Sequence, residues 1–406
     1  MAPIRSYTIC VAEEKIQDLK ERLRLAKFPP PSVLTDSWDY GAPVSDVKRL
    51  AARWCDGYDW RAAEAKLNEL PHFMTQIPVD GYGELDIHFI HQKGQAENSI
   101  PLLFCHGWPG SFFEVIKILP LLTAEKDGLS FTVVAPSLPN FGFSSGPDKP
   151  GFGMPQYAET LHKLMLELGH NQYVTQGGDW GFFITRFMGI QYPKHCLASH
   201  LNYLRAHPPS LFRTPWQFSR YLLPRTKAEK EGLARCQWFE GEGFGYCIQQ
   251  STRPTTVGLA WADSPVALLS WIYEKLHDWT DNYPWEDDEI LTWISIFQFS
   301  TAGSEASARI YFEMEHPEPS QQHLDWVPDV KLGLSYFPRD LIVLPKCYGR
   351  TLGPVVFENV HERGGHFAAH ELPEELVEDV REMFSRGGGA FDVTKRLQEM
   401  AVADSL

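Results

Sequence analysis

The chain has 406 residues, of which 43% are hydrophobic and 22% charged, a composition typical of a globular protein large enough for more than one structural unit. Its net charge of −15 disfavours nucleic acid and anionic membranes as partners. Seven cysteines without C-x-x-C spacing predict free thiols, and no apolar run reaches 18 residues. We therefore expect a soluble, cytoplasmic protein without an integral membrane segment.

Residues 1–84 predict an N-terminal lead segment. Apolar residues recur there at helical spacing, at Ile16, Leu19, Leu23 and Ala26. Three prolines at 29–31 end that helix, because proline cannot continue it. A tryptophan-rich stretch follows, with Trp38, Trp54 and Trp60. We expect this segment to pack on a larger core.

An alternation of strands and helices begins at residue 85. Residues 85–91 alternate like a strand, whereas 101–105 and 131–135 are continuous apolar runs, as buried parallel strands should be. Residues 206–325 are rich in tryptophan and helix-like segments and lack strong strand runs, and the β pattern resumes at 340–344 and 354–357. The pattern predicts an α/β fold with a mostly parallel sheet, whose core (85–205 and 326–406) is interrupted by a helical cap (206–325).

The most informative motif is Gly177-Gly178-Asp179-Trp180-Gly181, which lies between an apolar run and a helix-like stretch. Strand, sharp turn and helix form the pattern of a nucleophile elbow, where the tip residue is usually serine. An aspartate at the tip would form an ester with an alkyl carbon rather than an acyl-enzyme. The pattern therefore favours opening of C–O or C–halogen bonds. The alternative interpretation of Asp179 is an ordinary helix N-cap.

A second motif, His106-Gly107-Trp108-Pro109-Gly110-Ser111, directly follows an apolar strand. In α/β-hydrolases, which carry such an elbow, the loop after this strand supplies one backbone N–H to an oxyanion hole. The residue after the nucleophile supplies the other. The donors would be Trp108 and Trp180. The alternative is a plain glycine- and proline-containing turn.

A third motif, Arg363-Gly364-Gly365-His366-Phe367, follows the last strand pattern and fits a base on a tight loop. We expect Asp340 to orient His366, with Asp325 and Asp329 as alternatives on spacing alone. His361-Glu362 and His366 nearly mimic a zinc H-E-x-x-H motif, but the spacing is one residue too long and two glycines disfavour the helix. We expect neither a metal nor a cofactor.

Together these motifs resemble the microsomal-type epoxide hydrolases, in particular soluble fungal members, over nearly the whole length. The motifs around Trp108, Asp179 and His366 match, as do the lead segment and Gln250-Ser251-Thr252-Arg253-Pro254 of the cap. Relatives on eukaryotic internal membranes carry an N-terminal anchor, which we do not expect here.

The resemblance implies conversion of an epoxide to a vicinal diol. It places the two proton donors for the ring oxygen at Tyr246 and Tyr311. Without the resemblance, these two could not be chosen from the chain's fifteen tyrosines. It also matches Asp340 to the family's acidic residue that orients the histidine. The many aromatic residues favour an apolar or aromatic substrate. A homodimer is implied by resemblance only, and detoxification and biosynthesis are both open as roles.

Three other functions compete with this interpretation. A haloalkane dehalogenase also uses an aspartate nucleophile on this fold, and Trp108 and Trp180 could act as its halide donors. A receptor on a hydrolase fold often lacks a triad member, whereas all expected members are present here. Nucleotide binding through the glycine-rich residues 241–245 is disfavoured, because this run does not lie between a strand and a helix.

Overall fold

The computed structural model describes residues 3–316 and 324–404. Its centre is a nine-stranded sheet in the order β1-β2-β3-β5-β4-β6-β7-β8-β9. From β5 to β9 all neighbours pair parallel, whereas β1, β2 and β3 form an antiparallel edge. The predicted fold class is confirmed. The strands are β1 (Arg5–Ser6), β2 (His72–Val79), β3 (Gly83–Gln92), β4 (Ile100–Cys105), β5 (Phe131–Pro136), β6 (Tyr173–Gly177), β7 (Cys196–Leu201), β8 (Lys331–Tyr336) and β9 (Val355–Val360).

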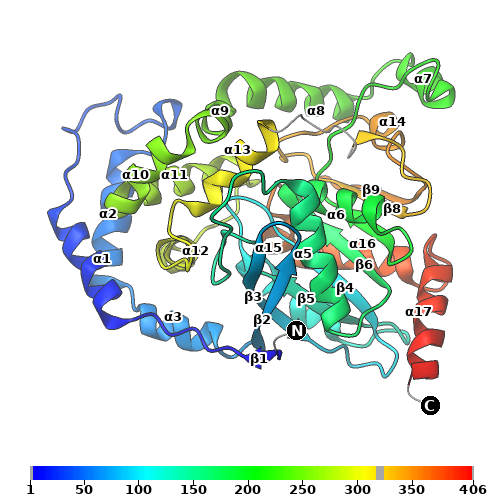
Figure 1. Ribbon diagram of the computed structural model, residues 1–406. Coiled ribbons are helices and arrows are strands. Elements are labelled where there is room, and N and C mark those ends of the chain that lie inside the picture. The colour runs from blue at the N-terminus through cyan, green and yellow to red at the C-terminus, as the bar shows by residue number, and fades with distance from the viewer. Residues whose placement is uncertain (1–2, 317–323, 405–406) are drawn as a thin grey trace.

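Helices cover both faces of the sheet, because its central strands are buried on both sides: every residue of β5, β6 and β7 is buried. On one face α5 and α6 pack together, and on the other α16 packs against α4 and α17. Figure 1 shows this layered arrangement. The core helices are α4 (Leu119–Thr123), α5 (Met154–Glu167), α6 (Trp180–Gln191), α14 (Lys346–Gly349), α15 (Ala368–Glu371), α16 (Pro373–Phe384) and α17 (Phe391–Asp404).

The segment between β7 and β8 forms the helical layer above the sheet in Figure 1. Several of its helices begin at strong start signals: Thr226 and Glu229 form a capping box for α8, and Ser264 caps α11 just before a proline. The helices are α7 (Pro215–Tyr221), α8 (Lys227–Trp238), α9 (Gly245–Thr252), α10 (Pro254–Asp263), α11 (Pro265–Asp278), α12 (Asp287–Gln298) and α13 (Arg309–Glu315).

The N-terminal segment joins the sheet edge to the cap. It supplies β1 and β2, and its helices α1 (Glu13–Leu25), α2 (Val44–Ala52) and α3 (Trp60–Leu67) run along the side of the molecule and pack on α11 and α12. The Trp54 indole donates a buried hydrogen bond to Ser295 Oγ at 3.0 Å. Arg53 makes a bidentate contact with the Asp288 carboxylate at 2.6 and 2.7 Å. The lead segment thus braces the cap against the core.

One predicted strand is wrong. Residues 340–344 form a loop, and the strand that precedes them is β8. Gly333 interrupts the apolar run of β8, so the sequence signal of this strand is weak. The strand nevertheless pairs with both β7 and β9. The apolar run after Asp340 instead forms a loop beneath the cap: Leu341 and Ile342 are buried, and the half-buried Val343 donates its N–H to the Cys236 sulfur at 3.2 Å. Asp340 therefore lies beyond the carboxyl end of a parallel strand, an edge where α/β sheets place functional groups.

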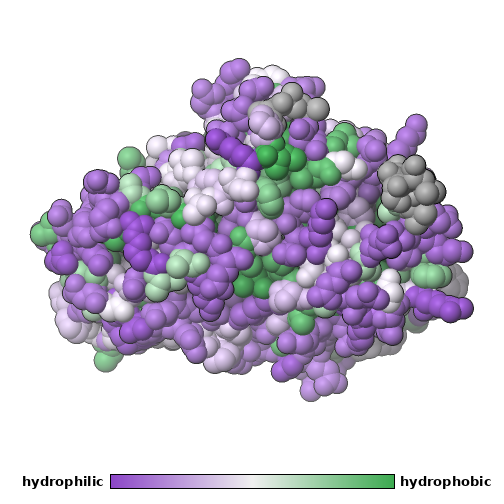
Figure 2. All heavy atoms as spheres, turned by 90° about the horizontal axis from the view of Figure 1, so that it is seen from below, coloured by the Kyte–Doolittle hydropathy of each residue, from purple (hydrophilic) through white to green (hydrophobic). Residues whose placement is uncertain are grey.

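The surface reflects the acidic composition. Figure 2 shows a face that is mainly hydrophilic, with small and scattered hydrophobic areas. All seven cysteines are free thiols. Among residues 3–316 and 324–404, no helix has the length and apolarity needed to span a membrane. The predicted homodimer and the cytoplasmic location stay predictions.

Candidate active site

The nucleophile elbow is formed between β6 and α6. Asp179 has φ 49° and ψ −124°, a strained backbone conformation for a residue with a side chain, and α6 begins at the next residue. The turn is possible because Gly181 passes close to β4: a Cβ there would lie 2.0 Å from the Cys105 carbonyl oxygen. The surrounding structure thus holds the Asp179 side chain at the carboxyl end of the sheet.

The loop after β4 contacts this carboxylate directly. The Trp108 backbone N–H donates to Asp179 Oδ1 at 2.8 Å. Gly107 permits the close approach, because a Cβ there would lie 2.2 Å from the same oxygen. The second expected donor, the Trp180 N–H, makes no hydrogen bond to this carboxylate among the described residues, although it lies in the first residue of α6.

His106 fixes the shape of this loop. Its Nε2 accepts from the Leu138 N–H at 3.1 Å, and Nδ1 lies 3.0 Å from the Gly107 carbonyl oxygen, to which it donates. Burial lowers the pKa of His106 to about 4, so the ring stays neutral and satisfies both contacts. This histidine therefore has a structural place in the loop.

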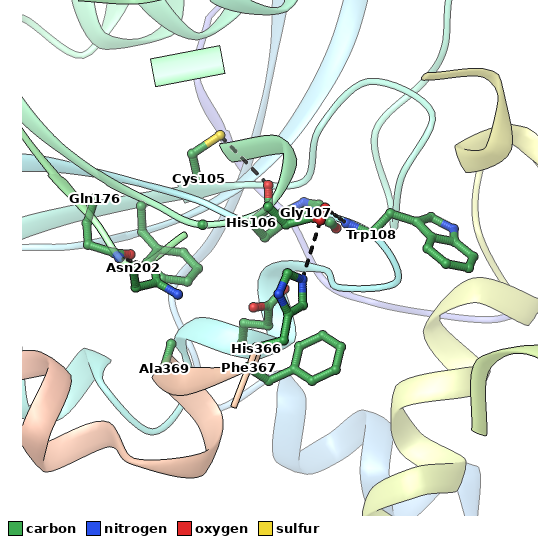
Figure 3. A pocket seen from close by; sticks show the side chains of 13 residues that line it. Cys105, His106, Gly107, Trp108, Gln176, Asn202, His366, Phe367 and Ala369 are labelled. Carbon is green, nitrogen blue, oxygen red and sulfur yellow. Dashed lines mark hydrogen bonds and ion pairs between the residues drawn. The ribbon is translucent and has the colours of Figure 1, made fainter. Parts of the chain in front are cut away.

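His366 lies between two carboxylates. Its Nδ1 is 2.6 Å from Asp340 Oδ1, and its Nε2 is 3.4 Å from Asp179 Oδ2. The Leu341 N–H also donates to Asp340 Oδ1, at 2.6 Å. In Figure 3 the imidazole points toward the loop that contains Gly107 and Trp108. Neither alternative acid, Asp325 or Asp329, contacts His366 in the described part of the chain.

The charge state of His366 follows from this position. Burial disfavours its charged form, but Asp340 and Asp179 more than offset this effect and raise the pKa of His366 to about 10. In the free protein the ring is therefore a cation at neutral pH. If either carboxylate lost its charge, the pKa of His366 would fall.

Tyr246 on α9 and Tyr311 on α13 face the nucleophile from the cap. Their ring centroids are 5.8 Å apart, and the rings are nearly perpendicular. Trp108 stacks on Tyr246, and Trp180 meets Tyr311 edge to face. Burial raises the pKa of both phenols well above the ordinary value, so both keep their protons. The buried Tyr311 hydroxyl interacts with the Tyr246 phenol and makes no hydrogen bond to any other group among the described residues.

A cavity of about 220 Å³ joins the two halves of the site. Asp179 lies in its wall together with both tyrosines, and most other lining side chains are aromatic or apolar. Arg205 and Glu315 add charge at the wall, with Arg205 Nε donating to the Tyr203 hydroxyl at 3.0 Å. The space suits a compact, largely apolar molecule with one polar group near the phenols.

Sequence reasoning missed Glu114, which follows Gly110 by four residues and lies beside the nucleophile and the histidine. It is buried, and burial raises its pKa to about 8. A single glutamate in a short turn belongs to no helical or strand periodicity. Only the closeness of Glu114 to the glycine-rich loop motif could have indicated its importance. Among the described residues, no group of three or more His, Cys, Asp or Glu side chains could hold a metal ion.

The chain is similar in sequence and fold to known proteins. The model of the epoxide hydrolase N terminus matches residues 4–115, and that of the alpha/beta hydrolase fold matches 100–231. A Stigmatella aurantiaca protein that carries the name of an epoxide hydrolase is 39% identical over 94% of this chain and 84% of its own length. Epoxide hydrolase 1 of Sus scrofa is 36% identical over 93% of this chain and 88% of its own. The Aspergillus niger epoxide hydrolase structure is 35% identical with a TM-score of 0.80, covering 93% and 95% of the two chains.

Proposed function

The chain belongs to the epoxide hydrolase family, and from this premise we propose that it converts epoxides to vicinal diols through a covalent ester on Asp179. One observation carries the proposal. A single cavity holds the Asp179 carboxylate on one wall and the phenols of Tyr246 and Tyr311 on another, with His366 directly behind the carboxylate. A nucleophile and two acids that face each other across a compact space fit the opening of a three-membered ring.

In the first half-reaction Asp179 Oδ2 attacks one carbon of the epoxide, and the bond from that carbon to the ring oxygen breaks. Oδ1 accepts the Trp108 N–H at 2.8 Å, whereas Oδ2 makes only the longer contact of 3.4 Å with His366 Nε2, so Oδ2 is the less tightly held oxygen and the one that attacks. The ring oxygen receives a proton from one phenol while the other donates a hydrogen bond. Ring strain supplies much of the driving force, so acids as weak as these buried phenols suffice. The product is an ester between Asp179 and the alkyl group.

In the second half-reaction water attacks the Asp179 carbonyl carbon. His366 Nε2 takes a proton from the water, and Asp340 holds the imidazole through Nδ1. The Trp108 N–H, with Trp180 N–H as the second donor, stabilises the oxyanion. The bond from the carbonyl carbon to the alkyl oxygen then breaks, His366 returns the proton to that oxygen, and the diol leaves.

The electrostatics explain how one histidine serves both steps. Before attack, His366 is a cation beside the Asp179 carboxylate, with a pKa of about 10. Ester formation removes the Asp179 charge, so the pKa of His366 falls and the ring can release its proton to solvent, from which the phenolate left by the first half-reaction regains one. The histidine thus becomes a base only after the intermediate has formed.

Haloalkane dehalogenation is the second candidate, because one specific observation favours it. The indole N–H groups of Trp108 and Trp180 are buried and have no hydrogen-bond partner among the described residues. Such donors could hold a departing halide. The family and the paired phenols favour the epoxide, and halide release from a haloalkane series distinguishes the two functions.

The function is tested by assaying diol formation from styrene oxide and by measuring the mass of the intact His366→Gln variant after exposure to substrate. We expect the wild type to form the diol and the variant to gain the mass of one substrate, because the ester forms but is not hydrolysed. Halide release without diol formation would support the rival, and a variant with no added mass would contradict the ester.

A further inference from the structure

A second, much smaller cavity lies beside the nucleophile, apart from the substrate space. Its volume is about 10 Å³, room for a single water molecule. Its polar walls come from separate parts of the fold, namely Glu114, Gln176, Asp179, Asn202 and His366. A water there would meet the groups that the second half-reaction must bring together.

The loop after β4 is shaped around the Glu114 carboxyl group. A Cβ at Gly110 would lie 1.6 Å from Glu114 Oε1, so only glycine leaves room for this side chain. Glu114 lies in a short 3₁₀ helix (Phe112–Val115) whose residue Phe112 is fully buried, so the carboxyl group is carried on a fixed element. The Glu114 carboxyl group has no role in the first half-reaction.

Gln176 provides an independent observation on the other wall. Its Nε2 donates to Asn202 Oδ1 at 2.7 Å, whereas its Oε1 is buried and has no hydrogen-bond partner among the described residues. A buried acceptor without a donor is costly unless a ligand or a water supplies one. Figure 3 shows Gln176 and Asn202 together on one side of this space and His366 on another.

We infer that this cavity is the seat of the hydrolytic water, and that Glu114 is a positioning residue that holds this water for attack on the Asp179 ester. The inference rests on the proposed function and deepens it. The water oxygen forms a bond to the Asp179 carbonyl carbon, one water proton goes to His366 Nε2 and then to the departing alkoxide, and the second stays on the new carboxyl group and is lost when it ionises. Glu114 exchanges no atom with the substrate.

The protonation of Glu114 suits this role. Burial raises its pKa to about 8, an effect that His366 opposes and Asp179 reinforces. At neutral pH the group is therefore mainly an uncharged acid, whose carbonyl oxygen accepts from water and whose hydroxyl donates. In the ester intermediate a charged carboxylate here would be a second anion near His366, besides Asp340, and would hold the ring in its protonated form, which would slow the water attack.

The test separates the two half-reactions by rapid quench with excess enzyme. In Glu114→Leu, which removes the polar atoms, we expect alkylation of Asp179 to keep the wild-type rate while ester hydrolysis slows on the order of 10²-fold, as expected for a misplaced reactant. Glu114→Gln keeps an acceptor and a donor, so it should restore hydrolysis at pH 7. If the wild-type hydrolysis rate changes near pH 8, the rate of Glu114→Gln should not change there, because glutamine does not ionise.

Glu114→Asp provides a second variant that keeps the carboxyl group but withdraws it by one methylene, and it decides the question if the leucine variant does not fold. Its ester hydrolysis should also slow while alkylation is unchanged. Wild-type ester hydrolysis in Glu114→Leu or in Glu114→Asp would overturn the inference. Absence of any ester in the wild type would instead contradict the proposed function, so the two failures are distinguishable.

Discussion

The two walls of the substrate cavity differ in almost every physical respect. The core wall is charged: Asp179, His366 and Asp340 form a continuous ion-paired row at the carboxyl end of the sheet. The cap wall presents two neutral phenols to the nucleophile, and burial retains their protons, while the charged Glu315 lies elsewhere on the same wall. In the proposed mechanism the core thus holds the nucleophile and the base, and the cap holds the acids for the ring oxygen.

This difference is reflected in how each wall is built. Asp179 is fixed by a strained turn between a strand and a helix, and backbone N–H groups meet the carboxylates on both sides of His366. Tyr246 and Tyr311 are fixed by ring packing on Trp108 and Trp180, which themselves belong to the core motifs. The two tryptophans therefore connect the walls, although single substitutions can disturb one wall at a time.

The largest effect is expected from Asp179→Ala, which removes the nucleophile of the core wall. Diol formation should fall by about 10⁴-fold or more, as for other covalent enzymes that lose the nucleophile. Asp329→Ala is a matched control, because that carboxylate is exposed and should leave the rate unchanged. Retention of more than a tenth of the activity by Asp179→Ala would contradict its role.

A smaller effect is expected from the cap wall. Tyr246→Phe and Tyr311→Phe should each slow alkylation on the order of 10²-fold, the lower end of the range for general-acid catalysis, because the remaining phenol still donates. The double variant should be slower than either. Tyr203→Phe is the control from the same cavity, since its hydroxyl accepts from Arg205. Equal slowing of alkylation in all three single variants would argue against a special tyrosine pair.

The charge difference between the walls predicts a dependence of stability on pH. The pKa of His366 is about 10 in the folded protein and near 6.5 unfolded, so its contribution to stability is full below pH 6.5 and is lost as the pH rises through 10. Thermal unfolding of the wild type should therefore occur at lower temperature at pH 10 than at pH 7. His366→Gln should show a smaller decrease over the same range, and an equal decrease would contradict this account.

The smallest effect on chemistry is expected from the brace between the lead segment and the cap. Trp54→Phe removes the indole N–H that donates to the buried Ser295 hydroxyl and should cost about 1 to 3 kcal/mol of stability, measured by denaturant unfolding. Tyr58→Phe is the milder comparison, because the Thr292 hydroxyl keeps its bond to the Asp288 carbonyl oxygen. A loss of activity without loss of stability in Trp54→Phe would show that the brace positions the cap tyrosines.

Asp179 and His366 of the core wall were readable from the sequence because they lie in local turn motifs, whereas spacing alone left Asp340 with two alternatives. A strand, a glycine-rich turn and a helix predict the place of Asp179, and the paired glycines before His366 predict a tight loop. The cap tyrosines have no such local signal: their positions depend on packing between helices far apart in the chain, so only the family resemblance identified them.

Two features show where sequence patterns fail. The apolar run after Asp340 was predicted as a strand, but it is buried as a loop beneath the cap, and periodicity does not distinguish these environments. Glu114 was missed because its significance comes from Gly110, Asp179 and His366 meeting it in space. A buried carboxyl group in a short turn becomes informative only once its neighbours are known.

The central claim, a covalent ester on Asp179, is tested most directly by a single turnover in ¹⁸O-water with excess enzyme. After the reaction the diol and the peptide that contains Asp179 are examined by mass spectrometry. The account predicts ¹⁸O in the Asp179 peptide and unlabelled oxygen delivered to the diol, because water attacks the carbonyl carbon of the ester. Labelled diol together with an unlabelled peptide would mean that water attacks the epoxide directly, and would contradict the account.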